Sequence, residues 1–112
     1  MKRIHYASGS LLTGDAVAEA LVGYAAALAA NQAAAEVHAP AVLDSGERGE
    51  VLLLLGPASQ IMAEDETGAG DELEAPEFVS ELEEKTRELG PKRAGFVQSG
   101  TDDVEGLDLD FL

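Results

Sequence analysis

The stretch that most constrains the fold is a run of five aliphatic residues, Val51 to Leu55, with Gly49-Glu50 before it and Gly56-Pro57 after it. Five residues are few for a helix, and glycine and proline mark the ends of regular elements, so the run predicts a β-strand over 50–55. Neighbouring side chains of a strand point to opposite faces, so an unbroken apolar run predicts apolar surroundings on both faces. We therefore expect this strand at the centre of a sheet.

Two elements are predicted near the start of the chain. Alternation over residues 2–7 predicts a first strand. A second pattern, with apolar residues three or four apart, predicts a long helix over 14–32, capped by the hydroxyl of Thr13. Gly23 weakens a helix interior, which suggests a close approach of helix and sheet at that point. The apolar stripe consists of Val17, Leu21, Tyr24 and Leu28.

Between this helix and the apolar run, alternating apolar and polar residues predict a further strand over 35–43. Pro40 cannot donate a backbone hydrogen bond, so we expect this strand at a sheet edge or at a bulge. The glycine-containing segment 44–49 has the length of a hairpin connection to the strand at 50–55.

These elements predict an α+β fold of the split β-α-β type. With the apolar strand in the middle, the three strands have the spatial order 1-3-2, in a small mixed or antiparallel sheet. The helix over 14–32 covers one face. A second helix is predicted over 76–89, between a favourable first-turn proline and Gly90-Pro91.

The rest of the chain divides into one compact domain and a tail. We expect a single α/β domain over residues 1–100, with a mobile acidic loop at about 64–74 and a short final strand over 94–97. Residues 101–112 form a separate acidic and hydrophobic C-terminal tail, either a weak edge strand or a peptide that orders only against a partner. Its alternating residues are Leu107, Asp108, Leu109, Asp110 and Phe111.

The charge of the chain limits its partners. The formal net charge is −15, and residues 47–112 contain 18 of the 22 acidic residues but only five of the seven lysines and arginines. Such a field opposes binding to nucleic acids and to anionic membranes. Without cysteine, thiolate metal sites and a cysteine nucleophile are excluded. Because no stretch has the length of a signal peptide core or a transmembrane span, we predict a cytoplasmic protein.

The best candidate for a small-ligand site is the hydroxyl-rich link that is predicted between the first strand and the long helix. Backbone amides at a helix N-terminus can bind an anion, although the link matches neither GxxxxGK[ST] nor GxGxxG. Glycine turns and helix capping explain the same residues. The predicted ligand-binding residues are His5, Ser8, Gly9, Ser10, Thr13, Gly14 and Asp15.

No metal site or cofactor is predicted. His5 and His38 lie on separate predicted strands with another strand between them, so they cannot jointly ligate a metal, and close HxH or HExxH spacing is absent. The acidic loop at 64–74 lacks the DxDxDG pattern of a calcium loop. No catalytic residue stands out.

Two classes of function therefore remain open. The first is a non-enzymatic interaction or regulatory module. It is favoured by the apolar strand, by the small number of aromatic residues and by the tail, which could bind a protein partner. Self-association as a homodimer is predicted because few elements are available to cover both faces of the sheet. The alternative is a small-ligand-binding or catalytic domain that uses the 8–15 link.

Overall fold

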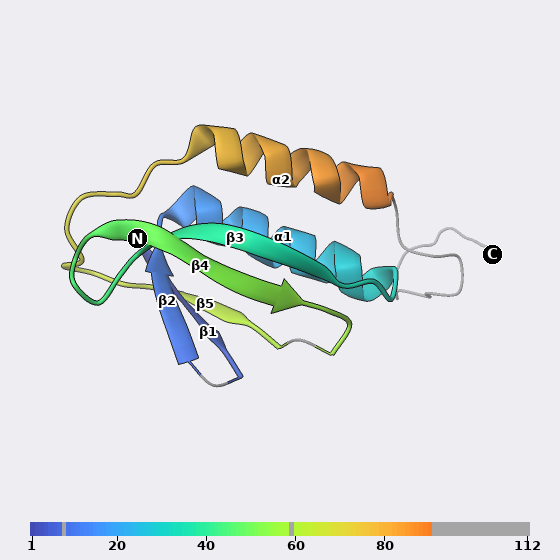
Figure 1. The fold of residues 1–112 in the computed structure, drawn as a ribbon, viewed down its shortest axis with the longest axis horizontal. Helices are drawn as coiled ribbons and strands as arrows, with labels where there is room; N and C mark the ends of the chain where they lie inside the picture. The colour runs from blue at the N-terminus through green and yellow to red at the C-terminus, as the bar shows by residue number, and fades with distance from the viewer. Residues whose placement is uncertain (8, 59, 91–112) are drawn as a thin grey trace.

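The computed structural model describes residues 1–7, 9–58 and 60–90. They form an antiparallel five-stranded sheet and two helices, as Figure 1 shows. The elements in chain order are β1 (Lys2–Tyr6), β2 (Gly9–Thr13), α1 (Asp15–Ala30), β3 (Ala35–Val42), β4 (Arg48–Leu55), β5 (Met62–Asp65) and α2 (Pro76–Leu89).

The α+β class and five of these elements agree with the sequence. Both predicted helices and the strands predicted over 2–7, 35–43 and 50–55 are present, with ends shifted by one or two residues. The strands β2 and β5 were not predicted. The expected strand at 94–97 and the tail at 101–112 lie outside the described residues.

The predicted strand order 1-3-2 is wrong. The order is β4-β3-β2-β1-β5, so among the described strands the apolar β4 lies at one edge of the sheet and pairs only with β3. The split β-α-β arrangement fails because β2 folds back on β1 as a hairpin before α1 begins. That hairpin reverses the chain direction, and the strand after α1 then joins the sheet antiparallel to β2.

The sheet is nearly divided between β2 and β3. These two strands share a single bridge, Leu12 opposite Val42, whereas β3 and β4 pair along their whole length. Pro40 explains the weak junction. The N–H and C=O of one strand residue point to the same side, and Pro40 has no N–H to donate toward β2. Its carbonyl instead accepts a hydrogen bond from the hydroxyl of Thr13 at 2.7 Å.

Pro40 was expected to place its strand at a sheet edge. The strand β3 is interior by order, but most of its length has no partner on the β2 side. Thr13 was expected to cap α1. Its side chain is fully buried and bonded to Pro40, and the helix N-cap is Gly14 without a side-chain cap.

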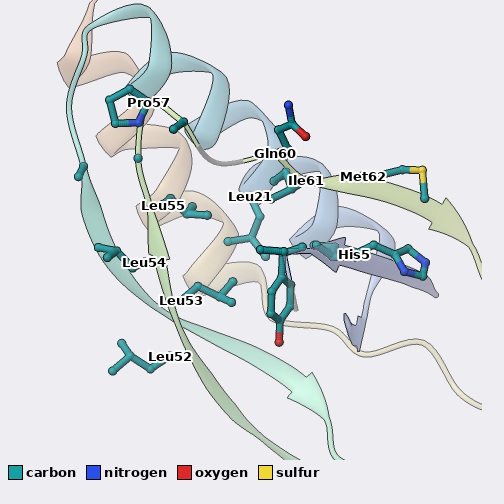
Figure 2. Close-up of a pocket in the computed structure, with 16 residues that line it drawn as sticks. His5, Leu21, Leu52, Leu53, Leu54, Leu55, Pro57, Gln60, Ile61 and Met62 are labelled. Carbon is teal, nitrogen blue, oxygen red and sulfur yellow. The ribbon is translucent and has the colours of Figure 1, made fainter. Parts of the chain in front are cut away.

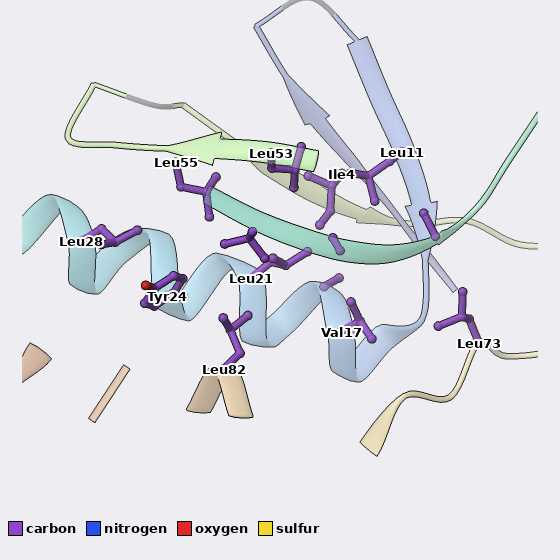
Figure 3. Packing of buried hydrophobic residues seen from close by; sticks show 14 residues of the cluster. Ile4, Leu11, Val17, Leu21, Tyr24, Leu28, Leu53, Leu55, Leu73 and Leu82 are labelled. Carbon is purple, nitrogen blue, oxygen red and sulfur yellow. The ribbon is translucent and has the colours of Figure 1, made fainter. Parts of the chain in front are cut away.

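The helices lie on the same side of the sheet. Figure 3 shows α1 between the strands and Leu82 of α2, so α1 contacts apolar groups on two sides. Because Asp15 and Glu19 are its only charged residues, this double burial suits its composition. The largest fully buried apolar side chains of the core are Ile4, Val17, Leu21 and Leu28.

Both helices cover the same face of the sheet, because α2 packs on α1. The expectation about Gly23 needs correction. Gly23 does not mark a close approach to the sheet: it lies on the exposed side of α1, and a Cβ placed there meets nothing within 4 Å. The face of the sheet away from the helices therefore has no helix over it in the described part of the chain.

Candidate functional site

A pocket of about 1100 Å³ lies between β4 on one side and β1 and β5 on the other (Figure 2). Residues 52–55 of β4 and residues 4–7 in and after β1 form its two long sides. The connection from β4 to β5 contributes Pro57 and Gln60, and α1 contributes Leu21. The pocket is therefore built from segments that are far apart in the sequence.

The pocket lies at the edge of β4. Alternate residues of a strand point to opposite faces, so a hollow on one face meets every second side chain. Here four consecutive leucine-rich positions, 52–55, line the space. On the opposite side, β1 pairs with β5 only as far as His5 opposite Met62, and Tyr6 has no partner in β5. The space is thus bordered by strand edges that lack a neighbour among the described residues.

The β4 side chains are divided by burial. Leu53 and Leu55 are buried at 9% and 3% exposure, whereas Leu52 and Leu54 are exposed at 57% and 72%. The exposed pair points away from the helices, and Figure 2 shows both leucines on the far side of the strand from Leu21. Apolar burial on both faces, which the five-residue run suggested, is therefore wrong.

The pocket has little capacity for acid–base chemistry. Its lining contains no Asp, Glu, Lys or Arg, and the titratable lining residues are His5 and Tyr6. His5 Nε2 lies 2.6 Å from Glu64 Oε1, and Figure 2 shows the ring pointing away from the leucines. Among the described lining residues, no nucleophile is paired with a base. The arrangement suits binding of apolar groups.

The residues predicted to bind a small ligand are not gathered at one site. Gly9 and Ser10 lie in β2, where Ser10 Oγ accepts a hydrogen bond from Arg3 at 3.2 Å, and Thr13 is buried. Ser8 lies outside the described residues. His5 contacts Glu64 on the other side of β1. A continuous strand therefore takes the place of the expected loop.

The N-terminus of α1 already holds an internal carboxylate. The backbone amide of Asp15 donates to Glu72 Oε2, at the position where an anionic ligand was expected. Gly14 packs closely against the same segment, because a Cβ there would lie 2.0 Å from the carbonyl oxygen of Leu73. Segment 72–73 thus covers this end of the helix.

The same carboxylate joins a charged cluster at the chain start. The α-amine of Met1 lies 2.8 Å from Glu72 Oε1 and 3.0 Å from Asp15 Oδ1. Hydrogen bonds to Glu72 and then Asp15 raise the pKa of this amine above its usual 8.0. The bond from the amine lowers the pKa of Glu72, as does the Asp15 amide. The predicted loop at 64–74 begins within β5 and is held here by Glu72 and Leu73, so we expect mobility only around 67–71.

The histidines occupy separate strands, His5 on β1 and His38 on β3, with β2 between them. No group of three or more His, Asp or Glu within residues 1–7, 9–58 and 60–90 is arranged to hold a metal ion.

Sequence reasoning missed the pocket because its residues share no local motif. The available signal was the β4 run itself, which was interpreted as fully buried. A second signal was the charge match between Lys2-Arg3 and Glu64-Asp65, which face each other in the β1–β5 register.

Comparison with known proteins adds no assignment. A scan of protein-family models, a search of curated proteins and a search of solved structures all return no match for this chain. Neither α1 nor α2, the helices of the described segments, has the length and apolarity needed to cross a membrane.

Proposed function

We propose that this protein is a non-enzymatic interaction module that binds an extended polypeptide segment along the free edge of β4. The observation that carries the proposal is the pocket beside that edge, lined by four consecutive residues of the strand. Proteins usually protect an edge strand with charges, proline or a covering element. Residues 51–55 contain no charge and no proline, and no described strand pairs with the outer edge of β4.

An added strand would use both features of this site. Backbone hydrogen bonds along an edge strand supply affinity, and pockets for alternate side chains supply specificity. The pocket offers apolar surface on the helix side, where Leu53 and Leu55 lie, and the exposed pair Leu52 and Leu54 offers apolar surface on the other side.

The test uses the full chain, labelled with ¹⁵N, and a neutral strand probe, acetyl-(Thr-Val)₃-Thr-amide. We expect chemical-shift changes and slower amide exchange in β4, with smaller changes at Tyr6 and Met62. A matched probe with N-methylated alternate amides keeps the side chains but cannot complete the backbone ladder, so it should bind at least about tenfold more weakly, since several hydrogen bonds each contribute about 1 kcal/mol. Equal binding of the two probes would reject strand pairing.

Small-ligand binding is the second candidate function, favoured by the volume of the pocket. Pockets for drug-sized ligands have volumes of about 300–1,000 Å³, and this one, at about 1100 Å³, is slightly larger. The ligand would be apolar and would occupy the β4 pocket instead of the 8–15 segment. Native mass spectrometry separates the candidates, because a co-purifying small molecule favours this one.

Self-association is the alternative to a peptide partner at this edge. Two copies could pair β4 with β4 in antiparallel fashion, which would join the two sheets about a twofold axis. Sedimentation of the full chain at tens of micromolar, at low and moderate salt, tests this: a monomer in both conditions would reject the homodimer.

A further inference from the structure

We infer that the segment bound by β4 is basic: an extended peptide with apolar side chains on one face and Lys or Arg on the other. This inference rests on the proposed function and specifies the chemistry of the partner. It comes from the carboxylates that accompany Leu52 and Leu54 on the sheet face away from the helices.

The strand register places these carboxylates. Residues directly opposite each other in an antiparallel pair share a face. Glu36 of β3 is opposite Leu54, and Glu50 precedes Leu52 on the same face of β4. Each exposed leucine therefore has a glutamate beside it.

Neither glutamate is neutralised by lysine or arginine. Glu36 has no ion-pair partner among the described residues, and Glu50 approaches only His38 Nδ1, at 3.9 Å. His38 and Glu50 are both about two-thirds exposed. Arg48, at the start of β4, donates to the carbonyl of Glu74, and Arg3 of β1 pairs with Glu66. The face beside the pocket is therefore acidic as well as apolar.

A basic strand fits both properties. A lysine or arginine next to Leu54 could lay its apolar stem over the leucine and extend its charged end toward Glu36. A second one could reach Glu50 directly across the new strand pair. The other face of the peptide would place apolar side chains in the pocket, whose lining carries no Asp, Glu, Lys or Arg.

Charge disfavours the two occupants that the chain itself supplies. The tail alternates Leu107, Leu109 and Phe111 with two aspartates, so pairing along β4 would set those aspartates beside Glu36 and Glu50. A second copy brings a net charge of −15 and the same glutamates. A basic partner instead gains from the long-range field, which speeds association.

In the experiment, the full chain is titrated with three probes at 150 mM NaCl, and binding is measured by calorimetry and by ¹⁵N chemical-shift changes in β4. The probes are acetyl-(Lys-Val)₃-Lys-amide, acetyl-(Glu-Val)₃-Glu-amide and a peptide with the sequence of residues 105–112. We expect the lysine probe to bind at least about tenfold more tightly than either acidic probe, because each added charge contact contributes up to about 1 kcal/mol.

Paired variants locate the recognition. The double variant Glu36→Gln, Glu50→Gln should bind the lysine probe about fivefold more weakly than the parent. The control, Glu81→Gln with Glu88→Gln, removes the same charge from exposed positions of α2 and should change affinity less than about twofold. Thermal melts of both variants establish that they are folded.

Each other outcome overturns the inference. Equal or tighter binding of an acidic probe rejects a basic partner, and tight binding of the 105–112 peptide identifies the tail as the occupant. If both double variants weaken binding of the lysine probe equally, net charge determines the affinity and Glu36 and Glu50 have no local role. A dimer paired through β4 identifies a second copy as the occupant. If β4 responds to the neutral probe but shows no preference for lysine, the inference fails alone; if it responds to no probe, the proposed function fails with it.

Discussion

The sheet ends in β4 on one side and in β5 on the other, and these two edge strands differ in length, charge and contacts. β5 has four residues, of which Glu64 and Asp65 are acidic, whereas β4 has eight and ends in four leucines. Side chains of β5 make polar contacts with β1: Lys2 forms an ion pair with Asp65, and His5 Nε2 lies beside Glu64. β4 has no such pairs in its leucine-rich half.

The difference indicates which edge is open to a partner. A short, charged edge resists pairing with another chain, because an added strand would bury carboxylates. A long apolar edge does not resist it. We therefore expect β5 to close the sheet and β4 to extend it, and the predictions below test each part of this contrast.

The largest expected effect separates the two faces of β4. Leu53→Asp places a charge at a side chain only 9% exposed, and should cost about 3 kcal/mol or more in the free energy of unfolding. Leu54→Asp, at a side chain 72% exposed, should change it by less than about 0.5 kcal/mol. Urea denaturation of both variants measures the contrast. Similar losses would mean that Leu54 is covered and that β4 is no open edge.

The next effect concerns the junction that joins the β4 half of the sheet to the β5 half. Thr13→Val keeps the shape of the buried side chain but removes the hydroxyl that donates to Pro40. The unsatisfied carbonyl should lower the free energy of unfolding by about 1–2 kcal/mol. The control, Ser10→Ala, removes an exposed hydroxyl of the same strand and should cost less than about 0.5 kcal/mol. A neutral Thr13→Val would show that the single bridge at Leu12 and Val42 holds the halves together.

The elements with a clear hydrophobic period could be predicted from the sequence. The α1 stripe around Leu21 and Leu28 and the alternation around Val37 depend on neighbouring residues, so local pattern was sufficient. β2 forms a hairpin with β1, with Ser10 opposite His5, but its five residues GSLLT show no regular alternation of apolar and polar side chains. β5 is short and pairs with a distant segment, with Asp65 opposite Lys2. Pairing between distant segments cannot be predicted from the pattern of neighbouring residues.

The candidate site was less predictable than the fold. A run such as Val51 to Leu55 fits a strand buried on both faces and equally an edge strand that binds a partner, and composition does not separate them. The predicted anion site depends on a residue that is distant in the sequence. Asp15 does lie at a helix N-terminus, but Glu72, 57 residues away, accepts its amide hydrogen bond. Only the folded chain reveals such a contact.

A smaller effect is expected at the β5 edge. Arg3 donates to both oxygens of Glu66, at 3.0 and 2.9 Å, and both side chains are about one-third exposed. Because solvent screens such a pair, Arg3→Met should cost only about 0.5–1 kcal/mol. Hydrogen exchange should accelerate in β5 and remain unchanged in β4. Lys85→Met, at an exposed position of α2, is the control for loss of a positive charge. If hydrogen exchange in β5 accelerated equally in this variant, Arg3 would have no local role.

The smallest effect is a pH dependence of stability that comes from the charges around Met1 and β5. Hydrogen bonds from Lys2 and from the Met1 amine lower the pKa values of Asp65 and Glu72, so their contribution is present above the usual values of 3.8 and 4.5 and is lost as pH falls through the lowered ones. The Met1 amine has a raised pKa, so its contribution is present below 8.0 and is lost as pH rises through the raised value. Stability from these groups should therefore be greatest at about pH 5.5–7.

Two matched variants separate the sites: Glu72→Gln should reduce both the acid and the alkaline loss, whereas Asp65→Asn should reduce the acid loss alone. Differences between each variant and the parent, measured by urea denaturation from about pH 2 to 10, cover both losses and remove most of the effect of overall charge. An alkaline loss that Glu72→Gln leaves intact would show that the Met1 amine does not stabilise this end of the molecule.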